Sequence, residues 1–464
     1  MYLFLLIKIL FVVYCFYSYV SKLRKFSDHD PKGPSVLPVL GNLHQLGKSP
    51  HITLMNMTKT YGDVFKFWMG DVSIKFKTQH LQSLAITIKT LVSARDERWY
   101  HNRKLVANSF TKTKLRSTVA VMEKQSELFI SMMSQFQKSG EPFSPMKYCK
   151  KYALNIIFSI VFADEIPYEE GVDEGRLGML VGWIDQIFKV GGAGSLFDYI
   201  TIIQPLFYGF KKFVIGTEMD PVYNFVAKIY DEHFETLDRN NPRDLLDVLI
   251  IDSEGKDRHG VIAVSIDFLL AGTDTSATTI EWFLLFMANN PDVQEKIGKE
   301  LKEVVGVNGN VTLANRNNTP YLVAAIKETL RVRPVGPFGL PRQTRESILL
   351  NDQVFIPKGA QILINFYGLA HSEKHWSEPE KFQPERFMGA SNEEKHADFY
   401  LPFSAGPRNC VGMNLANDEL YLAISNIMSN FVVSSFDGKP IYDVEEYGLT
   451  IKPQPFLLKL DKRI

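Results

Sequence analysis

The sequence predicts a mainly α-helical chain with a minor β part, preceded by an N-terminal transmembrane helix. Residues Met1 to Val20 are almost wholly apolar, and about 20 helical residues span the hydrocarbon core of a bilayer. From Leu105 to Asp238 apolar residues recur three and four positions apart, which is the helical period. Between Val64 and Phe76, aromatic and β-branched residues alternate on either side of Gly70-Asp71, which predicts a hairpin.

The composition is that of a globular protein and excludes one class of partner. The chain has 464 residues, of which 45% are hydrophobic, and Lys+Arg and Asp+Glu both number 52. A net charge of zero argues against nucleic acid as an electrostatic partner. The three cysteines, Cys15, Cys149 and Cys410, are too few and too scattered for a disulfide framework and fit a reducing compartment.

The N-terminal region divides into an anchor and a linker. Lys22, Arg24 and Lys25 follow the apolar run, and the positive-inside tendency then leaves the rest of the chain in the cytosol. A cleaved signal peptide is the alternative, but the charge lies after the apolar run and no small-residue cleavage site follows. The predicted division is a membrane anchor at 1–21, a basic and Pro/Gly-rich linker at 22–45 and a catalytic domain at 46–464.

The most informative stretch, Phe403 to Gly412, reads F-x-x-G-x-R-x-C-x-G. Cys410 offers one thiolate, Arg408 places a cation that favours it, and Phe403 can shield the sulfur. A lone cysteine is ordinarily a small buried hydrophobe, and structural zinc takes four Cys/His ligands. One soft thiolate in a Gly-rich loop suits the axial bond of a haem iron.

A second unusual stretch, Ala271-Gly272-Thr273-Asp274-Thr275, lies inside a long apolar segment. We expect this segment, Val261 to Asn289, to be a helix, with Asn290 as the N-cap of a following helix that begins at Pro291. Glycine in mid-helix costs about 1 kcal/mol relative to alanine, and a buried carboxylate costs more unless it is paired or neutralised. A helix that accepts both usually does so for function.

Three charged motifs predict contacts that hold a scaffold or an anion. Trp99 and Arg103, four residues apart, share a helix face and carry donors that suit a carboxylate. Glu328 and Arg331 form a potential ion pair at i,i+3 on a helix that begins at Thr319-Pro320. Arg386, in Pro384-Glu385-Arg386-Phe387, supplies a second guanidinium, and such a triad marks a fixed register more than raw stability.

In this order and spacing, the motifs resemble those of the cytochrome P450 family, the haem-thiolate monooxygenases, from about Pro31 to Phe456. The resemblance implies the cytochrome P450 fold and haem b (iron protoporphyrin IX), with Cys410 as the axial iron ligand. It also implies that Gly272 makes room for dioxygen, that Thr275 hydrogen-bonds to it and that Asp274 helps to deliver protons.

Further residues match the family by position. Trp99, Arg103 and Arg342 match contacts to the haem propionates. Phe338 to Leu340 and Gly448 to Thr450 match substrate contacts, and Met413 to Asn430 matches the helix that follows the ligand loop.

The resemblance also implies the reaction and its partners. One oxygen atom from O2 is inserted into a small apolar organic substrate, with electrons from an NADPH-dependent flavoprotein reductase. The expected location is the endoplasmic reticulum membrane, with a single span and a cytosolic catalytic domain. The residues expected on a basic face for the reductase are Arg98, Lys104, Lys147, Lys150 and Lys151.

Two alternatives remain open. One is a haem-thiolate isomerase or dehydratase that acts on peroxides, although such enzymes often lack the acid–alcohol pair present here as Asp274-Thr275. The other is a haem-binding but inactive chain. Only 28 residues lie between Gly70 and Trp99, where the family usually carries a longer segment.

Overall fold

The computed structural model of the protein contains two compact units, each described by itself below. The residues that the structure describes are 2–23, 25, 27–70, 72–73, 94, 96–109, 112–193, 199–200, 209, 217–389 and 396–464. The first unit comprises Met1–Thr87, Val190–Thr217 and Pro337–Gly368, and the second comprises the remainder of the chain. The sequence also predicts a helix at Leu81 to Lys89, and these residues lie outside the described part of the chain.

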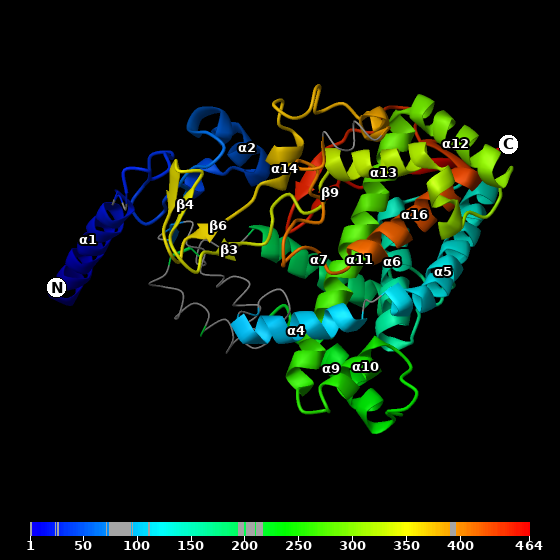
Figure 1. Ribbon diagram of the computed structural model, residues 1–464, viewed down its shortest axis with the longest axis horizontal. Coiled ribbons are helices and arrows are strands. Elements are labelled where there is room, and N and C mark those ends of the chain that lie inside the picture. The colour runs from blue at the N-terminus through cyan, green and yellow to red at the C-terminus, as the bar shows by residue number, and fades with distance from the viewer. Residues whose placement is uncertain are drawn as a thin grey trace. The chain divides into compact units, whose positions relative to one another are not determined.

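Among its described residues, the first unit combines two helices with short antiparallel strand pairs (Figure 1). Strand β1 pairs with β2, β3 with β6 and β4 with β5. The elements are α1 (Tyr2–Leu23), α2 (Pro50–Tyr61), β1 (Trp68–Met69), β2 (Val72–Ser73), β3 (Arg342–Gln343), β4 (Ile348–Leu350), β5 (Val354–Ile356) and β6 (Gln361–Ile362), with a 3-10 turn at Leu43–Gln45. The short helix α14 (Phe366–Ala370) spans the sequence boundary between the units.

The predicted hairpin around Gly70 is present, with its described ladder confined to two residue pairs. Trp68 pairs with Ser73 and Met69 with Val72. Gly70 has a φ of 63°, a conformation that glycine adopts without a steric penalty. A Cβ at this position would also collide with the backbone of Tyr199. Glycine is therefore required here for two independent reasons.

The last turn of α1 is fastened to the proline-rich linker rather than loosely tethered to it. The Lys22 Nζ donates to Ser18 Oγ at 3.0 Å and to the Leu37 carbonyl at 3.3 Å. The Val39 N–H donates to the same Ser18 hydroxyl at 3.2 Å. Lys22, expected as part of an exposed basic cluster, is instead buried. Helix α1 ends at Leu23, slightly beyond the predicted anchor.

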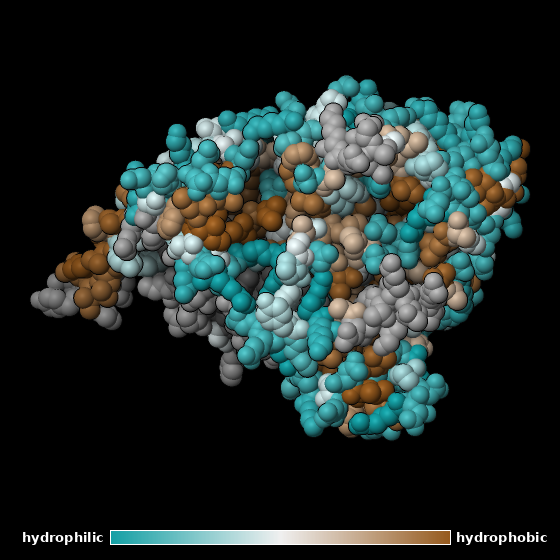
Figure 2. All heavy atoms as spheres, viewed as in Figure 1, coloured by the Kyte–Doolittle hydropathy of each residue, from teal (hydrophilic) through white to brown (hydrophobic). Residues whose placement is uncertain are grey.

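The first unit also exposes an apolar strand. Ile348, Leu349 and Leu350, the three residues of β4, are 42%, 45% and 39% exposed. A strand with one buried face alternates between buried and exposed residues, and β4 does not. Figure 2 shows apolar side chains at the surface in the region of β4 and along α1.

The second unit is mainly helical and, within the part of it that the structure describes, carries two antiparallel strand pairs, β7 with β10 and β8 with β9. Its helices are α4 (Asp96–Ser109), α5 (Lys112–Ser139), α6 (Pro145–Phe162), α7 (Gly175–Ala193), α9 (Asp220–Glu235), α10 (Leu245–Asp252), α11 (Arg258–Asn289), α12 (Pro291–Val305), α13 (Pro320–Val332) and α16 (Met413–Asn430), with 3-10 turns at Leu313–Asn318 and Pro384–Phe387. Its strands are β7 (Phe431–Ser435), β8 (Glu445–Tyr447), β9 (Ile451–Pro453) and β10 (Leu458–Lys462).

Helix α11 is the central element of this unit and confirms the helix predicted from Val261 to Asn289. It packs against α6, α9, α13 and α16 (Figure 1), and most of its side chains are buried. Asp257 caps its first turn by accepting from the Gly260 N–H at 3.1 Å. Asn290 does precede α12, but its side chain donates to the Phe286 carbonyl at 2.8 Å. Asn290 therefore occupies the N-cap position of α12 as predicted, but its side chain bonds to the end of α11 instead of to α12.

The predicted triad of Glu328, Arg331 and Arg386 is confirmed. Arg331 donates to both carboxylate oxygens of Glu328, at 2.7 and 2.8 Å, and the Arg386 Nε lies 3.2 Å from Oε1. The Gln383 backbone N–H adds a fourth bond at 2.9 Å. All three side chains of the triad are buried. The triad joins α13 to the Pro384–Phe387 turn that precedes the Cys410 loop in sequence.

Candidate functional site

The loop that ends in Cys410 is a closed turn immediately before α16. The Cys410 N–H donates to the Phe403 carbonyl at 2.9 Å, and the Asn409 N–H donates to the Gly406 carbonyl at 3.0 Å. Ser404 and Gly406 have positive φ values of 62° and 75°, which tighten the turn. Cys410 is exposed and precedes the first residue of α16, Met413.

Cys410 is exposed as a residue, but its thiol is largely surrounded by protein atoms. That burial raises the pKa of the thiol, and a hydrogen bond from the Gly412 N–H and the charge of Arg103 oppose the rise without cancelling it. Arg408, which the sequence suggested as the nearby cation, is directed elsewhere. Its guanidinium lies 4.2 Å from the centre of the Trp99 ring.

Helix α4 clamps the ligand loop. Arg103 donates to the Asn409 carbonyl at 2.9 Å and to the Asn409 Oδ1 at 2.7 Å. One turn earlier on α4, Trp99 stacks on Arg408, which also donates to the Ala94 carbonyl at 3.2 Å. Trp99 and Arg103 thus share a helix face as predicted, and both contact the loop. Their expected contact with a propionate stays a prediction.

Arg342 lies on β3 in the first unit, half-buried. Burial lowers the pKa of its guanidinium, and its propionate contact stays a prediction.

The middle of α11 is open on one side. Ala271 is exposed and Thr275 is half-buried, whereas Thr273, Asp274 and Ser276 are buried. The Thr275 Oγ1 donates to the Ala271 carbonyl at 2.6 Å. A core helix with an uncovered strip of small side chains, in the same unit as an exposed cysteine loop, fits a flat prosthetic group such as haem, which needs one thiolate and uncovered protein surface. The residues present therefore fit haem.

Gly272 has a packing role. A Cβ at this position would collide with the Ile157 side chain on α6. Glycine here lets α6 approach α11 closely, a reason independent of any room for dioxygen, and the expected role with dioxygen stays a prediction.

Asp274 is fully buried and held from two sides. The Thr450 Oγ1 donates to Asp274 Oδ2 at 2.7 Å, and the Lys452 Nζ lies 2.5 Å from Oδ1. The sequence correctly required a partner for a buried carboxylate, but it did not identify Lys452. Thr450, expected near substrate, is buried against Asp274.

Glu419 on α16 is a buried acid that the sequence analysis missed. Ser276 donates to its carboxylate, and Tyr152 donates to its backbone carbonyl at 2.9 Å. Burial raises the pKa of Glu419 to about 8. This contact ties the residue after Thr275 to the helix that follows Cys410. The available signal was an acidic residue within a largely apolar helix.

The prediction that five basic residues form an exposed face for a reductase is partly wrong. Lys150 and Lys151 are each 1% exposed; Lys150 pairs with Asp185, and Lys151 donates to the Glu170 carbonyl. Arg98 and Lys147 form ion pairs with acidic partners. Lys104 is exposed. Lysines are rarely buried, and the sequence contains no sign that these two are.

A hollow of about 460 Å³ lies elsewhere, between α4 and the segment that joins α10 to α11. Most of the residues that line it carry charged side chains, whereas small-molecule sites are lined predominantly by hydrophobic and aromatic side chains. The lining residues are Glu97, Arg98, His101, Asp252, Ser253, Glu254, Lys256 and Asp257.

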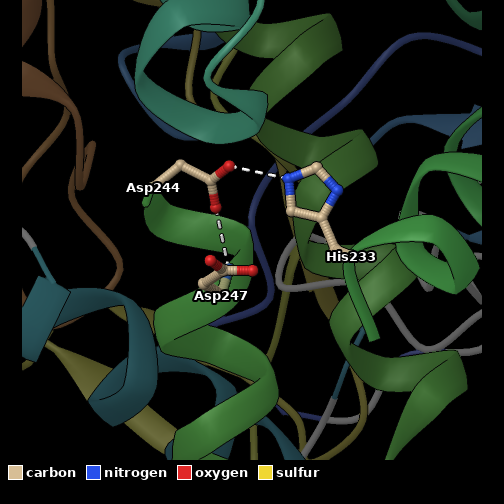
Figure 3. Close-up of side chains that lie close together, drawn as sticks. All are labelled: His233, Asp244 and Asp247. Carbon is tan, nitrogen blue, oxygen red and sulfur yellow. Dashed lines mark hydrogen bonds and ion pairs between the residues drawn. The ribbon is translucent and has the colours of Figure 1, made fainter. Parts of the chain in front are cut away.

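His233, Asp244 and Asp247 form a cluster with the composition of a metal site (Figure 3). The carboxylates already have partners. Asp244 accepts from the His233 Nε2 at 2.7 Å and from the Asp247 N–H at 2.8 Å, and Arg243 makes two side-chain bonds to Asp247 at 2.7 and 2.8 Å. The His233 Nδ1 faces the Ile229 carbonyl at 3.0 Å. Because both ring nitrogens face acceptors, this geometry favours the protonated ring, and the cluster is an ion-pair network rather than an open metal site.

Comparison with known proteins gives a consistent result. The sequence model of the cytochrome P450 family matches residues 72–460. The probable cytochrome P450 519E1 of Dictyostelium discoideum is 40% identical, over 96% of this chain and 97% of that protein. The probable cytochromes P450 508A4 and 508A1 of the same organism are 37% and 38% identical, over 98% of this chain and 98% of each relative.

The chain belongs to the cytochrome P450 family. The resemblance drawn from its motifs is therefore confirmed. The chain is an oxidoreductase of the monooxygenase class that binds haem b, as members of this family are. The alignment with the 519E1 protein extends over 493 positions, although this chain has 464 residues. That relative therefore contains residues without a counterpart here.

The His233–Asp244 pair predicts a pH-dependent stability. Burial lowers the pKa of His233, but the hydrogen bond and charge of Asp244 outweigh it, so the pKa is raised above 6.5. The pair therefore stabilises the fold fully below that pH and loses its contribution as pH rises through the raised pKa. We expect Asp244→Asn, which keeps an oxygen for the α10 cap, to cost about 1 to 2 kcal/mol at pH 6 and less at pH 9. Urea denaturation followed by circular dichroism measures this difference, and an equal cost at both pH values would contradict it.

Proposed function

We propose that this chain is a membrane-anchored haem-thiolate monooxygenase. It inserts one oxygen atom from O2 into a small apolar organic substrate, with electrons from an NADPH-dependent flavoprotein reductase. The observation that carries the proposal is the presence, within one unit, of an exposed Cys410 in a closed turn and of Thr275 at the open strip of α11, with the buried Asp274 next to it in sequence. Family membership supplies the reaction class.

Haem ligated by a thiolate supplies oxygen activation and O–O cleavage. The protein's own part is to hold and orient. Cys410 is the proposed axial ligand, with the Gly412 N–H bonded to its sulfur. Phe403 and Arg408 shape the loop, while Trp99, Arg103 and Arg342 are the proposed propionate contacts.

The hydroxyl of Thr275 is the proposed hydrogen-bond donor at the open strip. It is now bonded to the Ala271 carbonyl, and rotation about χ1 redirects it. Asp274 is the proposed proton donor beside it, acting through water.

Membrane attachment is part of the proposal. Helix α1 is apolar and exposed, with a mean hydropathy of 1.9 over Phe4–Leu23. Helix α11 is also long and apolar but is 67% buried, as a core helix would be. The exposed β4 lies in the same unit as α1. We propose a single span in the endoplasmic reticulum membrane.

The anchor predicts binding to lipid vesicles. The full chain should float with phosphatidylcholine vesicles, and removal of residues 2–23 should reduce the fraction of protein that floats. Equal flotation would contradict the anchor.

A peroxide isomerase or dehydratase is the second candidate. Such enzymes need no reductase and often lack an acid–alcohol pair. The Asp274-Thr275 pair, with a buried and fully hydrogen-bonded acid, favours the monooxygenase.

The ligand assignment predicts a spectroscopic change. After reduction and treatment with carbon monoxide, the full chain should show the strongly red-shifted Soret band of thiolate-ligated haem. Cys410→Ser should lose this band because the thiolate is gone. Cys149→Ala, which removes a fully buried thiol on α6, should retain it. A red-shifted band that survives Cys410→Ser would contradict the assignment.

The role of Thr275 predicts a split between two oxygen sources. We expect Thr275→Ala to lower reductase- and O2-driven dealkylation of an alkoxycoumarin by at least about tenfold, with little effect when hydrogen peroxide replaces both. Thr279→Ala is the matched control, since the Thr279 hydroxyl bonds to the Thr275 carbonyl one turn away. An equal loss with peroxide would favour the isomerase or dehydratase class.

A further inference from the structure

Asp274 is the inner member of a network of charged groups that extends to the surface. The Lys452 Nζ on β9 lies 2.5 Å from Asp274 Oδ1 and 2.8 Å from Asp185 Oδ1. The Asp274 side chain is fully buried, whereas that of Asp185 on α7 is 42% exposed. The Lys452 ammonium group therefore bridges the buried carboxylate of Asp274 and the partly exposed carboxylate of Asp185.

A second ammonium group and a third acid complete the network. Lys150 on α6 forms an ion pair with Asp185 and lies 3.9 Å from Asp274 Oδ1. Glu281 lies seven residues after Asp274 on α11, so the two share a helix face. Glu281 is 2% exposed, and among the described residues its Oε1 has no hydrogen-bond partner.

The charges of this network balance near neutral pH. Burial raises the pKa of Glu281 to about 8, with Lys150 opposing and Asp274 reinforcing the rise. Glu281 is then mostly neutral, and two ammonium groups face two carboxylates. Burial lowers the pKa of Lys452, but Asp274 and Asp185 outweigh it and the pKa is raised. Lys452 therefore stays charged and is not itself a proton carrier.

The network holds Asp274 away from the position that its proposed role requires. Consecutive residues of a helix project about 100° apart, and both Asp274 oxygens are bonded to donors from Thr450 and Lys452. Lys452 has a second acceptor in Asp185. Lys452 can thus release Asp274 without losing an ionic partner, and the cost of an unpaired buried ammonium is avoided.

We propose that Lys452 is a positioning residue that alternates between bridging Asp274 and Asp185, as in this structure, and pairing with Asp185 alone. While Lys452 bridges the two acids it locks the Asp274 carboxylate, and when it pairs with Asp185 alone it frees the Asp274 carboxylate to receive protons from water and pass them toward Thr275. This inference rests on the proposed role of Asp274 in proton delivery. The partly exposed Asp185 carboxylate and the buried Lys150 ammonium balance the charges of Lys452 and Asp274.

The first experiment tests the ion pair without catalysis. In the haem-loaded protein, Lys452→Met should lower the thermal unfolding midpoint by several degrees more at pH 8 than at pH 5, because the unpaired buried carboxylate is protonated only at low pH. The additional fall in the unfolding midpoint at pH 8 should be absent from the double variant Asp274→Asn/Lys452→Met. The control is Lys147→Met. Lys147 lies on α6, as Lys150 does, and its ion pair with Asp173 is more exposed, so this variant should show no such pH dependence. A pH-independent shift that persists in the double variant would overturn the proposal.

The second experiment tests the alternation. Asp185→Asn removes the alternative carboxylate, so Lys452 should stay on Asp274, and the fraction of NADPH electrons lost as hydrogen peroxide should rise severalfold. In the Asp274→Asn background the same substitution should have no further effect. An equal rise in both backgrounds would overturn the alternation. Failure of the proposed function would appear separately, as a missing thiolate band or absent reductase-driven turnover, while the thermal experiment would still report on the pair.

Discussion

The cost of burying charge is the physical constraint on which the rest of the second unit depends. An ionised carboxylate removed from water survives in a core only where hydrogen bonds and an opposite charge replace its hydration. Glu328 meets this requirement with four donors from α13 and the chain before the ligand loop. Removing one partner from such a set typically costs about 3 to 5 kcal/mol. The triad thus holds the register of the segment that leads to Cys410.

Asp274 meets the same requirement in a different way. In the triad, one carboxylate is shared by two guanidinium groups, and no second acid competes for them within it. Around Asp274, two ammonium groups face two carboxylates, one of them partly exposed. A network with an alternative acceptor can rearrange at low cost, whereas the closed triad cannot. The same constraint thus produces a rigid scaffold at one place and an adjustable contact at the proposed site.

The sequence predicted what depends on local pattern and missed what depends on distant partners. The helix at 258–289 was expected, from Val261 onward, because of its long apolar run and the Asn290-Pro291 signal. The helix at 413–430 was expected from the family resemblance, and Glu328 with Arg331 follows from i,i+3 spacing. Lys452 reaches Asp274 across 178 positions, and no periodicity identifies such a partner. Trp99 and Arg103 were placed correctly on one helix face, but the loop residues that they contact depend on the tertiary fold.

Gly272 connects the packing of the core to the electrostatics of the proposed site. Its missing side chain lets Ile157 of α6 lie against α11. Lys150 precedes Ile157 by seven residues and so shares its face of α6. The same helix α6 also carries the Lys150 ammonium to 3.9 Å from Asp274. The mid-helix glycine, which looks costly by helix propensity, and the buried carboxylate two residues later therefore both meet side chains of α6. Packing against Ile157 accounts for the glycine, and charge pairing accounts for the carboxylate.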